Sequence, residues 1–248
     1  MNTRAITPPL PRRRLVLAAG AGLLSAGAWW VGSPSQAAEA GVVIPPPTLD
    51  DLAARAGASN GPGEVAVLAG GCFWGVQAVY QRVHGVSQAV SGYAGGAAAT
   101  ARYEAVGSGS TDHAEAVRIT YDPGQVSYGR LLQIFFSVAH DPTQHDRQGP
   151  DRGPQYRSAV FPENPQQERI ARAYIAQLDR ARSFARPLAT TIEAGKRFYP
   201  AESYHQDYLT RHPDNPYIVA NDMPKLDELK RMFPERYRAA PALVGGAG

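Results

Sequence analysis

Residues 64–80 read EVAVLAGGCFWGVQAVY, and this stretch joins two different hydrophobic patterns through a pair of glycines. The first part, EVAVLAG (64–70), is an apolar run of strand length that ends in glycine, which is typical of a buried strand. From Trp74 onward the spacing of apolar residues becomes helical, at Val76, Val79, Tyr80 and Val83. The stretch therefore predicts a buried strand that turns directly into a helix.

Strands and helices continue to alternate toward the C-terminus. Further strands are predicted at residues 85–93, 114–122, 156–161 and 188–194. Further helices are predicted after Ser127, after Asn164-Pro165 and around Leu226, Leu229 and Met232. Hairpin-like and crossover-like spacings both occur. We therefore expect an α+β fold in which helices pack on a mixed sheet.

Composition divides the 248-residue chain into one domain and three end segments. Residues 64–238 carry the periodic patterns and are predicted to form a single domain. Residues 41–63 are rich in proline, glycine and small residues, and they are interpreted as a linker or an arm on the surface. Residues 239–248 are expected to be a disordered tail.

The N-terminal segment, residues 1–40, has the features of an export signal. Arg12-Arg13-Arg14 precede an uncharged, mostly apolar run from Leu15 to Val31, and small residues around 35–40 follow it. The arginines resemble a bacterial twin-arginine signal. We therefore expect an exported protein, periplasmic or secreted. An uncleaved N-terminal membrane anchor stays open as the alternative, because the apolar run is at the short limit of a spanning helix.

The charge balance argues against a nucleic-acid partner. The chain has 25 Lys and Arg against 22 Asp and Glu, but residues 1–38 contain four arginines and no acid. Without that segment the balance is 21 to 22, and no basic stripe remains to bind phosphates.

Cys72 is the only cysteine of the chain, so no disulfide forms within one molecule. Its predicted place at a strand-to-helix junction puts it among free backbone N–H groups, which favour a thiolate. Gly71 and its neighbour Gly70 are expected to allow a tight turn and to keep side chains away from the sulfur. A buried structural cysteine is the alternative.

Polar clusters elsewhere supply candidate partners for this thiol. They include Tyr103, Glu115, a polar loop at 140–158 and the aromatic stretch 198–209 with His205. Metal binding is not expected, because the histidine spacings match no zinc pattern and no Cys-x-x-Cys occurs. A cysteine hydrolase or acyltransferase stays open, with His113, His140 or His205 as the base. So does a binding module that holds thioethers on Phe73 and Trp74.

Six blocks in one order together resemble the A-type peptide methionine sulfoxide reductases. They are GGCFWG, SGYAGG, DHAEAVRITYDP, HDPTQ, QGPDRGPQYRSAVF and FYPAESYHQDYL, and they span about residues 65–210. The resemblance implies a two-layer α/β sandwich, the ferredoxin-like plait. It also implies reduction of the S epimer of methionine sulfoxide, free or in oxidised proteins, and hence protein repair.

The same resemblance implies a role for each site residue. Cys72 would be the nucleophile, Glu115 the acid that protonates the sulfoxide oxygen, and Tyr103 and Tyr156 additional donors to it. Asp151 would organise the site, Phe73 and Trp74 would seat the substrate methyl group, and Gly71 and His205 would support them.

The resemblance also implies that Cys72 becomes a sulfenic acid. Many relatives resolve it with a second cysteine, at the position of Gly75 or near the C-terminus, and this chain has neither. We therefore expect an external thiol, from a small molecule or from a thioredoxin-like or glutaredoxin-like protein, and no bound cofactor. The chain is expected to be a monomer.

Overall fold

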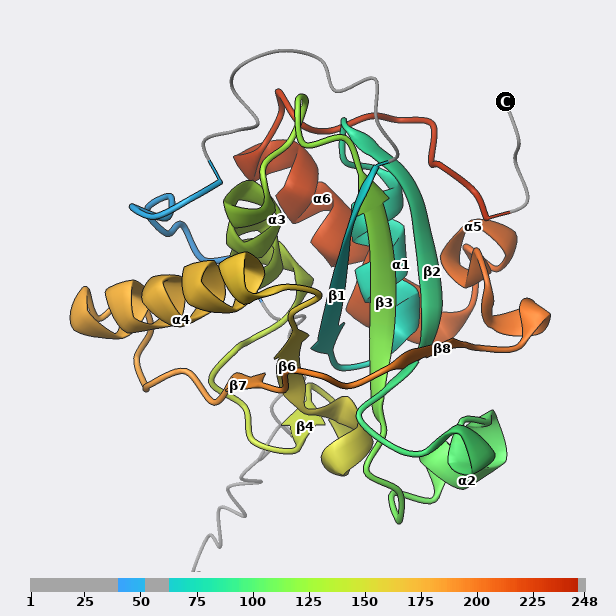
Figure 1. Ribbon diagram of the computed structural model, residues 1–248. Helices are drawn as coiled ribbons and strands as arrows, with labels where there is room; N and C mark the ends of the chain where they lie inside the picture. The colour runs from blue at the N-terminus through green and yellow to red at the C-terminus, as the bar shows by residue number, and fades with distance from the viewer. Residues whose placement is uncertain (1–39, 52–62, 245–248) are drawn as a thin grey trace, which may run out of the picture. The chain divides into compact units, whose positions relative to one another are not determined.

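The computed structural model of the chain describes residues 40–51 and 63–244 (Figure 1). The expected export signal therefore lies outside the described residues, apart from residue 40. Within the described ranges, no helix combines the length and the apolar character that a membrane-spanning helix needs.

Six strands form one mixed sheet. They are β1 (Glu64–Gly70), β2 (Val86–Ala94), β3 (Ala114–Tyr121), β6 (Ser158–Phe161), β7 (Thr191–Ile192) and β8 (Phe198–Pro200). Their order across the sheet is β7-β6-β1-β3-β2-β8. Strands β6 and β7 are parallel, and the other neighbours are antiparallel. A short hairpin of β4 (Arg147–Gln148) and β5 (Asp151–Arg152) lies in the predicted polar loop.

The helices are α1 (Phe73–Gln81), α2 (Tyr103–Gly107), α3 (Tyr128–Ile134), α4 (Pro165–Arg180), α5 (Tyr208–Arg211) and α6 (Met223–Met232). Helical turns of other types are η2 (Ala98–Thr100), η3 (Phe135–Ala139), η4 (Pro154–Tyr156), η5 (Ser203–His205) and η6 (Ile218–Asp222). Two predicted caps are present. The Ser127 hydroxyl accepts a hydrogen bond from the Arg130 N–H (3.2 Å), and Asn164 Oδ1 accepts one from the Gln167 N–H (2.9 Å).

The central connectivity is that of a ferredoxin-like plait, as predicted. The chain runs β1-α1-β2-β3-α3-β6, and these four strands lie side by side in the order β6-β1-β3-β2 (Figure 1). In the figure α1 lies behind β3 and β2. The predicted α+β fold with helices packed on a mixed sheet is confirmed.

The main core lies between one face of the sheet and the helices. Leu68 and Ile119 on the sheet join a buried cluster with Val79 of α1, Leu131 of α3 and Leu229 of α6. The alternate residues of the same strands form a smaller cluster on the other face, made largely of valine and alanine, including Val67, Ala69, Ala116 and Ala159. Both faces of β1 are therefore buried, which explains its continuous apolar run.

Two strand predictions differ from the structure. The strand expected at 188–194 is reduced to Thr191–Ile192, because the Ala189 N–H donates to the Pro142 carbonyl (2.7 Å) and not to a neighbouring strand. Conversely, β8 was not predicted. It is three residues long and ends in a proline, and its pairing with the edge of β2 leaves no periodic pattern in the sequence.

The two end segments are held against the domain where the structure describes them. In the arm at 40–51, Ile44 is 4% exposed and belongs to the main core. In the segment 239–244, the Ala242 N–H donates to the Gln81 carbonyl and the Val244 N–H to Asp207. The expectation of a disordered tail is wrong for these residues, because their backbone groups have partners in the domain.

Candidate active site

Cys72 lies between the end of β1 and the first residue of α1, as the sequence predicts. Gly71 has φ +84°, a conformation that side chains rarely adopt, so a glycine is required for this turn. The thiol is half-buried, and its sulfur accepts a hydrogen bond from the Trp74 N–H. A backbone N–H group in the first turn of α1 therefore fixes the position of the sulfur.

The glycines around Cys72 allow close packing and do not leave open space. A Cβ on Gly71 would lie 2.5 Å from the Cβ of Gln148, and a Cβ on Gly70 would lie 2.9 Å from the rings of His140 and Phe135. The expectation that these glycines keep side chains away from the sulfur stays a prediction. They let the loop and the η3 segment reach the backbone that carries Cys72.

Glu115 is brought next to Cys72 by β3. Its Oε2 accepts a hydrogen bond from the Phe73 N–H (3.0 Å), the backbone group next to the one that binds the sulfur. The side chain is only 4% exposed, and this burial raises the pKa of Glu115 to about 8, against the opposing effect of the Phe73 hydrogen bond. Glu115 is therefore a protonated acid near neutral pH, as its predicted role requires.

The predicted thiolate is not the resting form of Cys72. The Trp74 hydrogen bond lowers the pKa of the thiol, as expected at a helix N-terminus. Burial and the charges of Glu115, Asp222 and Asp151 outweigh it, and the pKa of Cys72 is raised well above its usual value. The sequence prediction considered only the effect of the helix N-terminus on the thiol. The carboxyl groups that oppose this effect come from three other segments of the chain.

The predicted tyrosines and Asp151 converge on the same place. Burial and then the charge of Glu115 raise the pKa of both Tyr103 and Tyr156, and Cys72 contributes to each shift. Both phenols are therefore neutral donors near neutral pH. Asp151, on β5, accepts a hydrogen bond from the Tyr217 hydroxyl, and burial raises its pKa.

An aromatic wall stands beside the thiol. Trp74 stacks on Tyr208 with ring centroids 3.8 Å apart and an angle of 8°. The Trp74 indole N–H donates to Nδ1 of His205 (3.2 Å), and the His205 ring also contacts Phe73 and Tyr103. Phe73 is 1% exposed and is the buried member of this aromatic group. Trp74 is half-buried and Tyr103 is exposed, so both are accessible to solvent.

The structure offers no base for the hydrolase alternative. Among the described residues, no histidine is hydrogen-bonded to Cys72. The ring nitrogens of His140 bind the Phe135 carbonyl and the Ser158 hydroxyl, and burial lowers its pKa to about 3. His113 binds the Gly96 N–H and the Ala97 carbonyl. His205 accepts the Trp74 N–H at Nδ1, so the neutral ring carries its proton on Nε2, which has no hydrogen-bond partner among the described residues and cannot accept a thiol proton.

Sequence reasoning missed three site residues that come from the C-terminal part of the chain. Tyr217 hydrogen-bonds Asp151, and Asp222 and Lys225 form a buried ion pair (3.1 Å) against the first turn of α1. Tyr217 directly precedes the η6 turn and Asp222 is its last residue. This short turn has no recognisable hydrophobic period in the sequence. Asp222 directly precedes α6, where an acidic residue is common as a helix cap, so nothing distinguished it.

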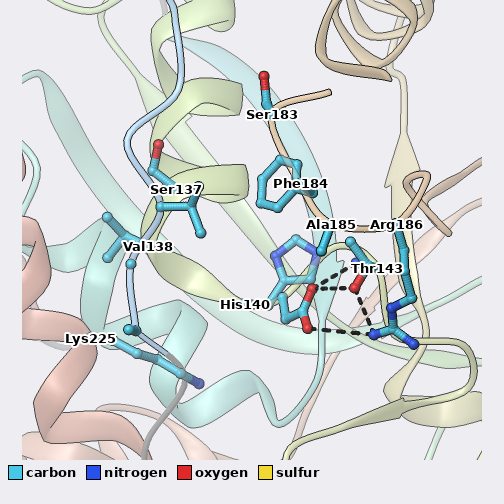
Figure 2. A pocket seen from close by; sticks show the side chains of 13 residues that line it. Ser137, Val138, His140, Thr143, Ser183, Phe184, Ala185, Arg186 and Lys225 are labelled. Carbon is cyan, nitrogen blue, oxygen red and sulfur yellow. Dashed lines mark hydrogen bonds and ion pairs between the residues drawn. The ribbon is translucent and has the colours of Figure 1, made fainter. Parts of the chain in front are cut away.

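A cavity of about 370 Å³ lies on another side of this region (Figure 2). Its lining includes His140, Phe184, Arg186 and Lys225, and none of the predicted site residues lines it. Arg186 donates a hydrogen bond to the Thr143 hydroxyl (2.8 Å), two labelled residues in Figure 2, and its guanidinium lies 4.0 Å from the Asp141 carboxylate. The described residues contain no group of three or more metal-ligating side chains.

Gly75 gives a direct test of this packing. A Cβ on Gly75 would lie 2.1 Å from Oδ1 of Asp222, so Gly75→Ala should lower the free energy of unfolding by about 1–3 kcal/mol through overpacking. Urea unfolding measures this difference. Gly107→Ala is the control, because a Cβ there would meet nothing within 4 Å, and its stability should be unchanged or slightly higher. Equal stability of both variants would contradict the packing.

Comparison with known proteins agrees with this arrangement. The family model described as peptide methionine sulfoxide reductase matches residues 64–237, which is well over half of the chain. The chain belongs to the peptide methionine sulfoxide reductase family. It is therefore an oxidoreductase of methionine sulfoxide, a protein-repair activity.

Individual members of the family resemble most of the chain. A peptide methionine sulfoxide reductase MsrA 2 of Mesorhizobium japonicum is 61% identical over 73% of this chain and 93% of its own length. An MsrA 2 of Synechocystis is 49% identical over 79% of this chain and 91% of its own length.

Solved structures of the family share the fold. Reduced Mxr1 from Saccharomyces cerevisiae has a TM-score of 0.56 and 32% identity, over 64% of this chain and 91% of its own. Methionine sulfoxide reductase A of Corynebacterium diphtheriae has a TM-score of 0.53 and 30% identity, over 74% and 92%.

Proposed function

We propose that this reductase acts on the S epimer of methionine sulfoxide through a sulfenic acid on Cys72, which an external thiol then resolves. One observation supports this most strongly. The adjacent N–H groups of Phe73 and Trp74 hold the Glu115 carboxyl and the Cys72 sulfur side by side. A nucleophile and a protonated acid are thus presented together to one sulfoxide group.

The first half-reaction follows from these two groups. As the Cys72 sulfur attacks the sulfoxide sulfur, Glu115 donates its proton to the sulfoxide oxygen, and the proton of the thiol passes to the Glu115 carboxylate, which restores the acid. Oxygen passes to the cysteine and methionine leaves, so that the products are a thioether and Cys72–S–OH. Tyr103 and Tyr156 donate hydrogen bonds to the same oxygen, and Asp151, held by Tyr217, keeps the loop in place.

The aromatic wall supports a seat for the substrate. Phe73 and Trp74 present apolar surface beside the sulfur, which suits the terminal methyl group of the side chain. His205 fixes the Trp74 ring through the indole hydrogen bond, which makes it a support for the seat. A methyl pocket on one side and hydrogen-bond donors on the other would select one of the two sulfoxide epimers.

Regeneration needs a thiol from outside the chain because Cys72 has no partner cysteine. One thiol, R–SH, forms Cys72–S–S–R and releases water. A second thiol then releases Cys72–SH and a disulfide. The reductant would be a small thiol or a thioredoxin-like or glutaredoxin-like protein, and the chain would act as a monomer with no bound cofactor.

The wild-type reaction tests this proposal. With dithiothreitol and a peptide that carries both sulfoxide epimers, chromatography should show complete loss of the S epimer and no loss of the R epimer. Without the thiol, about one methionine per enzyme should form. Formation of many methionines per enzyme in the absence of any thiol would overturn external resolution.

We also propose that the reductase works outside the cytoplasm, after export through a twin-arginine signal at residues 1–40. The support is the sequence pattern of Arg12-Arg13 and the apolar run. In a bacterial host, Arg12→Lys/Arg13→Lys should retain the protein inside the cell, and fractionation followed by immunoblotting measures this. Equal export of the variant would contradict the signal, and full-length protein in the membrane fraction would favour the anchor.

A further inference from the structure

The buried ion pair of Asp222 and Lys225 has no role in the reaction described so far. Asp222 is 0% exposed and Lys225 is 8% exposed. Lys225 Nζ lies 3.1 Å from Oδ1 of Asp222, and among the described residues Oδ2 of Asp222 has no hydrogen-bond partner. Such a pair is a poor source of stability, because removing both charges from water costs about as much as their attraction returns.

The pair packs against the first turn of α1, which begins directly after the reactive cysteine. Three residues after Cys72, the Cα of Gly75 leaves room for it. A Cβ there would be 2.1 Å from Asp222 Oδ1 and 2.8 Å from Lys225 Nζ. Asp222 therefore packs on the first turn of α1, whose N–H groups also hold Cys72 and Glu115.

The negative end of the pair acts on Cys72. Asp222 raises the pKa of the thiol, after burial and Glu115 and ahead of Asp151, and it also raises the pKa of Glu115. Burial raises the pKa of Asp222, and the charge of Lys225 and its hydrogen bond oppose this shift. The titratable groups around the sulfur from all neighbouring segments are Tyr103, Glu115, Asp151, Tyr156, Tyr217 and Asp222. Lys225 carries a positive charge next to this group and pairs with Asp222.

This charge distribution has opposite consequences for the two half-reactions. The first half requires a thiolate, which a nearby carboxylate disfavours. The second half requires a neutral sulfenic acid, because the incoming thiol must displace the sulfenic oxygen, and a hydroxyl leaves as water whereas an ionised oxygen does not. A nearby carboxylate favours that neutral form.

We propose that Asp222, held by Lys225, is a positioning residue that keeps the Cys72 sulfenic acid protonated and therefore open to attack by the external thiol. In that step the new S–S bond forms, the S–O bond breaks, and the proton of the incoming thiol leaves with the oxygen as water. This role rests on the proposed function, because it concerns the regeneration half of that cycle.

The test compares the two halves in Asp222→Asn. Alkylation of reduced Cys72 by iodoacetamide at pH 7 should become about tenfold faster, because loss of the carboxylate favours the thiolate. Regeneration of the trapped sulfenic acid by dithiothreitol at pH 8 should become about tenfold slower, because more of it is ionised. The slowing should lessen at lower pH. A general loss of structure would expose Cys72 and speed both reactions, so it would not give these opposite shifts.

Two further variants keep the result clear. Asp222→Asn/Lys225→Met removes both charges at once and serves if the single variant unfolds. Like the single variant, it should be alkylated faster and regenerated more slowly than the wild type. Asp207→Asn is the matched control, because Asp207 is 2% exposed and pairs with Arg211 (3.5 Å) but is not among the charges that act on Cys72. Its two rates should equal those of the wild type.

The outcomes separate this inference from the proposed function. If the wild type forms no methionine in the absence of thiol, the proposed cycle is wrong and the role of Asp222 falls with it. If the wild type forms about one methionine per enzyme but Asp222→Asn regenerates at the wild-type rate, or both rates fall together, the role of Asp222 alone is overturned.

Discussion

Cys72→Ser should reduce turnover of methionine sulfoxide by at least about 10³-fold, to the background of the assay. The serine hydroxyl can occupy the same site on the Trp74 N–H, but it is a far weaker nucleophile than sulfur and forms no sulfenic acid. The measurement is methionine release with dithiothreitol in excess, together with trapping of the oxidised enzyme by dimedone. Wild type should give one adduct per chain and the variant none.

The fold of this variant should be intact, because serine is smaller than cysteine and the site is half-buried. Its urea unfolding curve should therefore lie close to that of the wild type, within about 1 kcal/mol. Turnover by Cys72→Ser at more than a few percent of the wild-type rate would show that another group carries the chemistry.

Glu115→Gln should lower kcat by about 10²–10³-fold while the KM for the sulfoxide changes little. The amide can still accept the Phe73 N–H, but it cannot give a proton to the sulfoxide oxygen. The measurement is steady-state kinetics of the S epimer at saturating dithiothreitol. A loss confined to KM would assign Glu115 to binding and contradict its role as the acid.

The pH dependence gives the same acid a second signature. The pKa of Glu115 is about 8, so below pH 8 it holds its proton and above pH 8 it loses the proton and its function. Methionine formation in a single turnover should therefore fall as the pH rises through about 8, and Glu115→Gln should lose this decline. Glu163→Gln is the control, because burial also raises the pKa of Glu163 but its charge is not among those that act on Cys72.

The parts of the fold that the sequence predicts well are those with local patterns. The junction of β1 and α1 follows from the change of period around Gly71, and β1 has the predicted bounds. The caps of α3 and α4 follow from Ser127 and Asn164. In contrast, β7 and β8 owe their pairing to distant backbone groups, and such pairing leaves no period in segments of two or three residues.

The site shows the same division. Glu115 was found because it stands in a recognisable sequence block. In the structure its carboxyl group binds the N–H of Phe73, the residue directly after Cys72. The resting state of Cys72 could not be predicted, because it depends on burial and on carboxyl groups from β3, β5 and η6. Tyr217 and Asp222 come from an irregular turn, so only their position in three dimensions connects them to the thiol.

The arm at residues 40–51 sets a boundary for shortened forms of this protein. Asp50 accepts hydrogen bonds from the Ser127 hydroxyl (2.5 Å) and the Gly129 N–H (2.8 Å), and the Tyr174 hydroxyl donates to the Pro45 carbonyl (2.6 Å). A truncation at Glu64, where the family match begins, would expose the core surface beneath Ile44 and remove these partners of α3 and α4. The smallest piece that keeps these contacts begins near residue 40, upstream of the residues that the family model matches.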